Sequence, residues 1–154
     1  MLADFHTLPE ESRIWIYASE KALTTEHQSH ILSYISEHLK GWNAHQQPLT
    51  AGVTILENYF IVVALDESKN GASGCSIDTL QKTIQELEKE LSISLMNRLN
   101  VFCRIDNKIE CIPSFKLGSV AKADTPFYDL TILKKADFNT YLKSISEGWC
   151  AHLV

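Results

Sequence analysis

Concentrated positive charge is missing from this sequence. It has no cluster of basic residues beyond the pair Lys134-Lys135, and its formal net charge is −5. A protein that follows a nucleic-acid backbone needs a positive patch, and so does one that binds an acidic membrane surface. We therefore expect neither nucleic acid nor a membrane among its partners.

Long hydrophobic segments and export signals are also lacking. The longest apolar run, residues 59–65, is too short to cross a bilayer. The first residues, 1–6, contain no basic start followed by an apolar core, which is the pattern of a signal peptide. These two observations predict a soluble protein located in the cytoplasm.

Cysteine and histidine are too scattered to indicate disulfides or a metal. The four cysteines at positions 75, 103, 111 and 150 form neither a C-x-x-C pair nor a cluster with histidine. His27 and His30 are one helical turn apart, but no third ligand lies near them in the sequence. Because disulfides are typical of small secreted domains, we expect four free thiols, no metal and no other cofactor.

Common catalytic motifs are absent. The sequence contains no G-x-x-x-x-G-K-[ST], G-x-S-x-G, H-E-x-x-H or dinucleotide-binding pattern. What is present is an ordinary globular composition, with 45% hydrophobic residues in a chain of 154. A chain of this length and composition builds its own core, so we predict one domain spanning residues 1–154.

Apolar periodicity predicts two helices, over residues 25–40 and 76–91. In the first, Thr25 and Gln28 form a capping-box pattern and Gly41 is a stop signal. In the second, Ser76 is the expected N-cap, and the following Asp78 suits the positive end of the helix dipole.

Runs of β-branched and aromatic residues predict strands. Residues 13–19 form a first strand, and residues 52–65 form a hairpin around Glu57-Asn58. Because both faces of residues 59–65 are apolar, that segment is typical of a central strand covered on two sides.

A second hairpin is predicted over residues 99–113. A three-residue loop at 106–108 would place Arg104 opposite Glu110, which is a favourable cross-strand pair, and would bury both cysteines of the hairpin on one face. A two-residue loop would instead place Cys103 opposite Glu110, so we favour the longer loop.

The order β-α-β-β-α-β matches the split β-α-β arrangement of ferredoxin-like folds. We expect an α+β fold of two layers, with two helices on one face of a mostly antiparallel sheet. The core spans about residues 13–113, and residues 114–154 form a C-terminal α/β extension. Within that extension we expect a short helix over 115–122, a strand over 127–133 and a helix over 135–145.

Four short motifs resemble a known family. They are Trp15-Ile-Tyr17, Trp42-x-x-His45-x-x-Pro48-Leu49, Asp66-Glu67 and Ser73-Gly-Cys-Ser-Ile-Asp78. Together they resemble a family of short, uncharacterised bacterial proteins whose members often carry the name ABC transporter ATPase. The resemblance covers most of the chain, is strongest from 42 to 78, and implies a fold group without a particular chemistry. Relatives tend to end in a Trp-His pair, where this chain has Trp149-Cys150.

The loop that enters the second helix contains candidate catalytic residues. Cys75 lies at the start of the helix, where the dipole favours a thiolate, the nucleophilic form of cysteine. His45 is the candidate base and Asp66 is a candidate to orient it. The alternative is that Cys75 is only a small loop residue packed against the sheet.

The same loop is also a candidate anion site. Backbone N–H groups at a helix start bind phosphate or carboxylate groups, and Lys69 is near enough in the sequence to assist. The candidate ligand-binding residues are Gly71, Ser73, Gly74, Ser76 and Asp78. The alternative is that the glycines only let the loop turn and that Ser76 only caps the helix.

Three functions remain open from the sequence. We favour a binding or interaction module that takes a small anionic ligand or a protein partner near residues 71–78. A small thiol-dependent or acid/base enzyme using Cys75 and His45 is the alternative. A structural oligomer, with edge strands paired between chains, is the third.

Overall fold

The computed structural model describes all residues, 1–154, and the chain forms two compact units. The first contains residues 1–96 and 133–136, and the second contains residues 97–132 and 137–154. Helices combine with antiparallel sheets in an α+β fold, as predicted. The hairpin that we assigned to the core belongs to the second unit.

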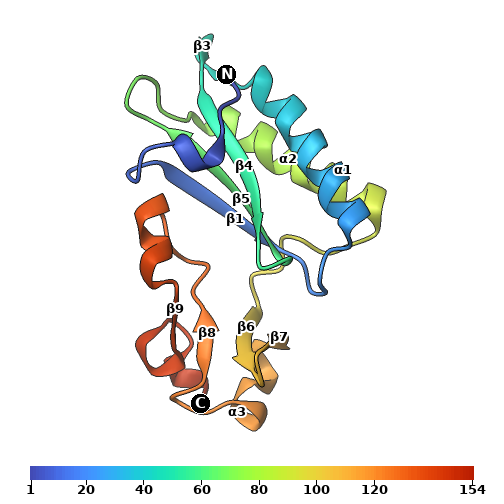
Figure 1. The fold of residues 1–154 in the computed structure, drawn as a ribbon, viewed down its shortest axis with the longest axis vertical. Coiled ribbons are helices and arrows are strands. Elements are labelled where there is room, and N and C mark those ends of the chain that lie inside the picture. Colours follow the sequence, from blue (N-terminus) through green and yellow to red (C-terminus); the bar gives the residue numbers. More distant parts are fainter. The chain divides into compact units, whose positions relative to one another are not determined.

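The first unit is built on a three-stranded antiparallel sheet with the order β1-β5-β4 (Figure 1). Its strands are β1 (Arg13–Ala18), β4 (Thr50–Leu56) and β5 (Phe60–Asp66). Every residue from 60 to 65 is fully buried, which confirms the central strand that the two apolar faces predicted. On one face of β4, Gly52 has no side chain, and the backbone of Ala3 and Phe5 occupies that space.

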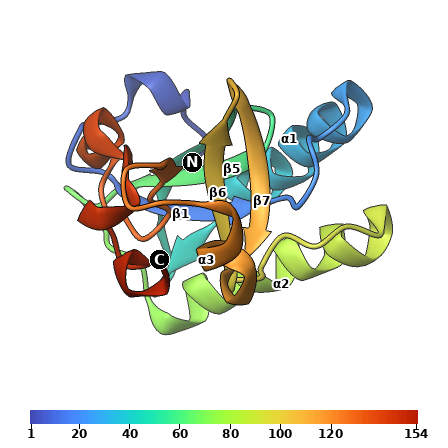
Figure 2. The same ribbon diagram turned by 90° about the horizontal axis from the view of Figure 1, so that it is seen from below.

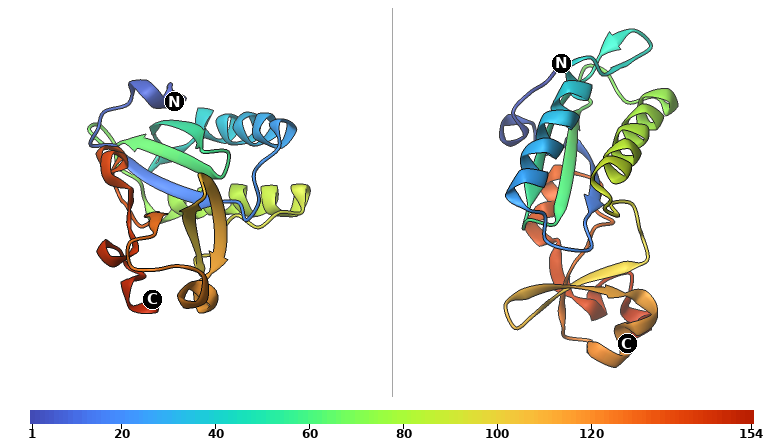
Figure 3. Two further views of the ribbon diagram at one scale, coloured as in Figure 1. Left: turned by 60° about the horizontal axis from the view of Figure 1, so that its bottom comes forward. Right: turned by 90° about the vertical axis from the view of Figure 1, so that its right-hand side faces the viewer.

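Two helices, α1 (Thr25–Lys40) and α2 (Gly74–Leu91), pack on the other face of this sheet (Figures 1 and 3). The N-cap of α1 is Thr24, whose hydroxyl accepts a 3.1 Å hydrogen bond from the amide of His27, so the predicted cap was wrong by one residue. Gln28 does not cap the helix; its side-chain amide donates to the carbonyl of Leu23.

The N-cap of α2 is Ser73, three residues before the predicted Ser76. The amide of Ser76 donates to the Ser73 hydroxyl at 3.1 Å, and the amide of Ser73 donates to the Ser76 hydroxyl at 2.7 Å. This reciprocal capping box satisfies two amides at once and extends the helix towards its N-terminus. As a result, Cys75 lies inside the first turn, and Asp78 lies beyond it.

The predicted ferredoxin-like sheet was not confirmed. The order β1-β5-β4 provides three strands, but the expected fourth strand pairs in a different sheet. The outer edge of β1 receives two isolated contacts: Ala18 donates to the carbonyl of Leu95 at 3.1 Å, and Ile14 donates to that of Leu133 at 3.0 Å. Periodicity identified the strand correctly but carries no information on its partner.

The second unit contains a four-stranded sheet with the order β7-β6-β8-β9. Its strands are β6 (Asn100–Ile105), β7 (Lys108–Pro113), β8 (Pro126–Tyr128) and β9 (Leu142–Ser144), and the short helix α3 (Leu117–Val120) follows β7 (Figure 2). The predicted helix over 135–145 was wrong: residues 135–140 form a 3-10 helix, and the chain then enters β9.

The β6–β7 hairpin has the register that we had rejected. Its loop is the two residues Asp106 and Asn107, with φ angles of 52° and 60°, and Cys103 lies opposite Glu110. Two successive residues with positive φ match the twist of the flanking strands, and Asp and Asn tolerate this conformation. The preference for this two-residue turn therefore decides the register. The Arg104–Glu110 pair of the alternative register would stabilise the hairpin by at most about 1 kcal/mol.

None of the helices combines the length and the apolar character that crossing a membrane requires.

Candidate functional site

A cavity of about 420 Å³ opens in the first unit where three segments meet. They are the end of α1, the small hairpin of β2 (Asn43–Ala44) and β3 (Gln47–Pro48), and the start of α2. The lining includes His38, Trp42, Asn43, His45, Ser73, Cys75, Ser76 and Thr79. The cavity thus brings together Cys75 and His45, which the sequence named as a candidate pair.

His45 is placed by a two-residue turn. His45 and Gln46 have φ angles of 50° and 66°, and the flanking Ala44 and Gln47 pair across the hairpin. This hairpin lies beyond the end of the sheet (Figure 3), and the His45 side chain is exposed at its tip. The ring therefore reaches both the cavity and solvent.

Trp42 fixes the position of the two helices at the cavity. Its indole nitrogen donates a 2.8 Å hydrogen bond to the carbonyl of Ser76, and only 3% of the residue is exposed. The ring of Trp15 packs edge-on against it at 5.8 Å between centroids. The end of α1 is thereby attached to the first turn of α2.

The first turn of α2 presents two unused amide groups. The amides of Ser76 and Ile77 donate to the hydroxyl and the carbonyl of Ser73, whereas the amides of Gly74 and Cys75 have no acceptor. Both residues are exposed, and no atom lies within 4 Å of the position that a Cβ would take on Gly74. In a helix of 18 residues, the dipole adds partial positive charge here.

His38 is the least expected member of the cavity lining. The residue is half-buried, and its Nε2 atom is buried without a hydrogen-bond partner. Burial lowers the pKa of the His38 ring, and the nearby carboxylate of Glu86 opposes that shift. No carboxylate lines the cavity, so its polar groups are the two histidines, hydroxyls, an amide side chain and the thiol.

Four of the candidate catalytic and ligand-binding residues lie outside the cavity lining: Asp66, Gly71, Gly74 and Asp78. Asp66 accepts a hydrogen bond of 3.0 Å from the amide of Ser68, and this backbone contact lowers the pKa of its carboxyl group. Glu67 accepts from the amide of Ala72 at 3.0 Å. The two carboxylates therefore shape the loop.

Sequence reasoning missed His38, Asn43 and Thr79 as lining residues. A usable signal existed for His38, because it precedes Trp42 by four residues, which is close to one helical turn at the end of α1. The ring centroids of these two residues are 6.1 Å apart.

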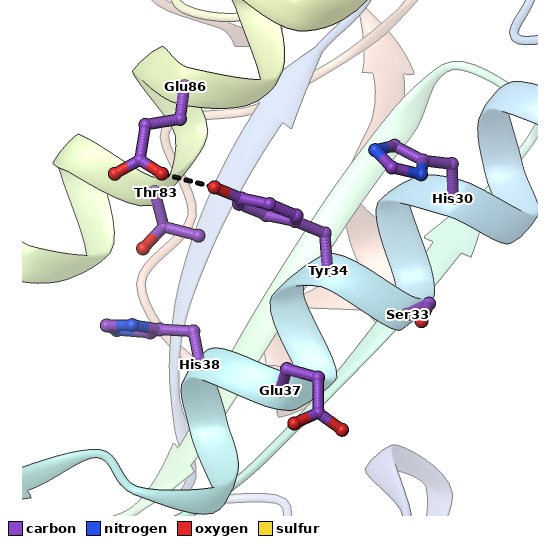
Figure 4. Close-up of a pocket in the computed structure, with 7 residues that line it drawn as sticks. All are labelled: His30, Ser33, Tyr34, Glu37, His38, Thr83 and Glu86. Atoms are coloured by element: carbon purple, nitrogen blue, oxygen red, sulfur yellow. Dashed lines mark hydrogen bonds between the residues drawn. The ribbon is translucent and has the colours of Figure 1, made fainter.

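A neighbouring cavity of about 540 Å³ lies between α1 and α2, and His38 lines it as well. Figure 4 shows Tyr34 reaching from α1 to α2, where its hydroxyl donates to the carboxylate of Glu86. This hydrogen bond raises the pKa of Tyr34 and keeps the phenol protonated. Nearer the start of α1, the ring of His30, which also lines this cavity, lies 2.9 Å from the carboxylate of Glu90.

No group of three or more His, Cys, Asp or Glu side chains is arranged to hold a metal ion. Comparisons of the chain with protein-family models, with curated proteins and with solved structures found no match.

Proposed function

We propose that this protein binds a small anionic ligand, through a phosphate or carboxylate group, in the cavity at the start of α2. One observation carries the proposal: the amides of Gly74 and Cys75 are unused at a helix start whose Ser73, Cys75 and Ser76 line a cavity without a carboxylate. Unpaired amides and the helix dipole together favour negative charge at such a position.

The hydrogen bonds around the helix start support one choice of donors for the proposed ligand. The hydroxyls of Ser76 and Thr79 already donate to backbone carbonyls. The Ser73 hydroxyl accepts from Ser76, and its own proton remains available. Ser73, Gly74 and Cys75 are therefore the three donors that we assign to the anion, with His45 at the rim.

In this proposal the protein is a binding module. The other residues of the cavity lining determine which groups the ligand carries besides its anionic group. Asn43 and the face of Trp42 offer one polar and one apolar contact there. The cytoplasmic location and the exclusion of nucleic acid and membranes as partners stay predictions from the sequence. The resemblance to the short bacterial proteins also stays a prediction.

A thiol-dependent enzyme is the second candidate. Cys75 is exposed and lines the same cavity as His45, which favours a nucleophile and a base at one site. Because Asp66 lies outside the cavity lining, this enzyme hypothesis relies on Cys75 and His45 alone. Cys75 is also the only cysteine of the first unit, so no second thiol of that unit is present to form a disulfide with it.

Titration with inorganic phosphate, followed through backbone amide signals in NMR, tests the proposal. We expect saturable shifts at Ser73, Gly74 and Cys75, because their donors contact the anion. The amide of Ser29, near the other end of α1, serves as the internal control. Shifts that do not saturate, or that are equally large at Ser29, would rule out a specific anion site.

A further inference from the structure

Strand β7 lies at one edge of the sheet in the second unit. It pairs with β6 on one side, and no strand of the chain pairs with it on the other (Figure 2). The open side of an edge strand presents backbone N–H and C=O groups, which are a template for pairing with another chain. The residues along this side therefore determine which partner β7 admits.

The backbone of Ile109 faces the open side of β7. At the end of the hairpin, the amide of Ser114 donates to the carbonyl of Leu99 at 2.8 Å, so these two residues form a hydrogen-bonded pair. Hydrogen-bonded and non-hydrogen-bonded pairs alternate along an antiparallel ladder. Ile109 lies five positions before Ser114 and opposite Arg104, so it belongs to a non-hydrogen-bonded pair. Its N–H and C=O consequently point away from β6.

Two opposite charges flank Ile109. Lys108 and Glu110 are both exposed, and neither forms an ion pair within the chain. Their symmetrical placement makes the segment complementary to itself in an antiparallel pair. When Ile109 of one copy lies opposite Ile109 of another, Lys108 of each copy lies opposite Glu110 of the other.

We propose that β7 is the interface of a two-fold dimer, in which β7 of one copy pairs antiparallel with β7 of a second copy about Ile109. Two hydrogen bonds join the Ile109 backbones. The Lys108–Glu110 pairs occupy the adjacent non-hydrogen-bonded positions, where the side chains are closest and opposite charges are stabilising. The two four-stranded sheets then form one continuous sheet. This interface is independent of the proposed anion site, which lies in the first unit.

Other registers lack this complementarity. A shift of the two-fold centre by one residue in either direction places Lys108 opposite Lys108 or Glu110 opposite Glu110, and like charges directly opposite each other are destabilising. A centre at Cys111 places Glu110 opposite Ile112 and leaves both charges without a counterpart. The two charges therefore favour a second copy in one register and discourage indiscriminate pairing at this edge.

A cavity of about 400 Å³ beside this edge adds a further complementary charge. Residues 110–113 of β7 line it, together with Lys116 and mostly apolar side chains. In the register about Ile109, the exposed Asp106 of the second copy lies opposite Ile112, which is part of this lining. The dimer thus brings an acidic residue of each copy next to the cavity that Lys116 of the other copy lines.

Sedimentation equilibrium from about 10 µM to 1 mM tests for the dimer. A contact one strand wide is small, so we expect weak, reversible association with a Kd within this range. Lys108→Glu and Glu110→Lys should each stay monomeric, because either substitution places like charges opposite each other. Lys122→Glu makes the same charge change at an exposed position outside β7 and should dimerise like the wild type.

An equimolar mixture of Lys108→Glu and Glu110→Lys is the most specific sample. One chain then presents two acidic residues and the other presents two basic residues, so we expect a heterodimer although neither variant pairs with itself. If either variant does not fold, salt dependence of the wild type replaces the mixture. Its Kd should rise several-fold between about 50 mM and 1 M NaCl, since salt screens exposed charges.

Each contrary result rejects a stated part of the inference. A wild type that stays monomeric throughout the range would overturn the dimer. Dimerisation of Lys108→Glu as tight as that of the wild type would place the contact on another surface. No association in the mixture, or a Kd that salt leaves unchanged, would reject the Lys108–Glu110 pairing. Phosphate binding at the start of α2 is measured separately, so these results leave the proposed function as it stands.

Discussion

The indole nitrogen of Trp42 donates a 2.8 Å hydrogen bond to the carbonyl of Ser76, across 34 residues of sequence. This single contact joins the end of α1 to the first turn of α2, and the hairpin with His45 begins at the next residue. The contact therefore holds in place each of the three segments that form the candidate cavity.

Trp42→Phe should destabilise the protein by about 2 kcal/mol, because it removes a buried hydrogen bond and leaves space in the core. We expect phosphate binding to weaken in parallel, since the start of α2 loses its attachment. Trp15→Phe is the matched control, because Trp15 packs against Trp42 without that hydrogen bond. Urea denaturation followed by circular dichroism measures both variants, and equal losses would contradict this role of the indole nitrogen.

Alkylation should distinguish the four cysteines. Cys75 is exposed, whereas burial raises the pKa of Cys103 to about 11 and also raises the pKa of Cys150. At about pH 8, iodoacetamide should therefore modify Cys75 well before Cys103 or Cys150, as read for each site by mass spectrometry. Phosphate should slow the modification of Cys75 if the anion occupies the same cavity.

The second candidate function, a thiol-dependent enzyme, predicts a different result in the same alkylation experiment. If His45 acts as the base for Cys75, His45→Asn should slow alkylation of Cys75 and change its pH profile. An unchanged profile would remove the second candidate function. Modification of Cys103 as fast as that of Cys75 would instead contradict the burial described above.

The loop of the β6–β7 hairpin provides a test of its register. Asn107 has a φ angle of 60°, so Asn107→Ala should destabilise the protein by about 1 kcal/mol, the cost of a left-handed conformation in an ordinary residue. Lys108→Ala is the control, because Lys108 is already in a strand and exposed. Equal stabilities of the two variants in urea would contradict the two-residue loop.

Asp129 should make the stability of the protein depend on pH. Burial opposes its ionisation, but hydrogen bonds from Thr131 and Lys143 outweigh burial and lower the pKa of its carboxyl group. A lowered pKa stabilises the fold at any pH above the ordinary carboxyl pKa of about 4. This stabilisation is lost as the pH falls through the lowered pKa. Asp129→Asn should therefore cost about 2 kcal/mol at neutral pH and much less in acid.

Urea denaturation of the wild type and of Asp129→Asn, at neutral pH and in acid, measures how much stability the substitution costs under each condition. Asp124→Asn is the control, since Asp124 is exposed and should change stability little at either pH. A difference between wild type and Asp129→Asn that stays constant into acid would show that the carboxylate is not the stabilising group.

The sequence predicted the elements of the first unit well, because their signals are local. The apolar stripe of α1 and the two apolar faces of β5 each follow from a period within one segment. The partner of residues 99–105 did not follow, since pairing between distant strands depends on the whole chain. The 3-10 helix at 135–140 was also missed, because the spacing of Phe138, Tyr141, Leu142 and Ile145 mimics a longer helical period.

The candidate site was predictable in part. Cys75 and His45 were singled out because a helix start and a loop histidine are typical places for function, and the structure places both at one cavity. Asp66 lies outside the lining of that cavity, and its carboxylate accepts a hydrogen bond from a nearby amide, which sequence alone does not reveal. His38 went unnoticed because its significance depends on burial and on a missing partner.

The central claim is that the start of α2 binds an anion, and Gly74→Asp tests it most directly. The position is open, and an acidic residue at a helix start is favourable, so this variant should fold as stably as the wild type. Gly74→Asn adds a side chain of the same shape without the charge and is the control. Calorimetric titration with phosphate should show binding to the wild type, weaker binding to Gly74→Asn, and none to Gly74→Asp. Equal phosphate affinity in the aspartate and asparagine variants would contradict an anion site at this helix start.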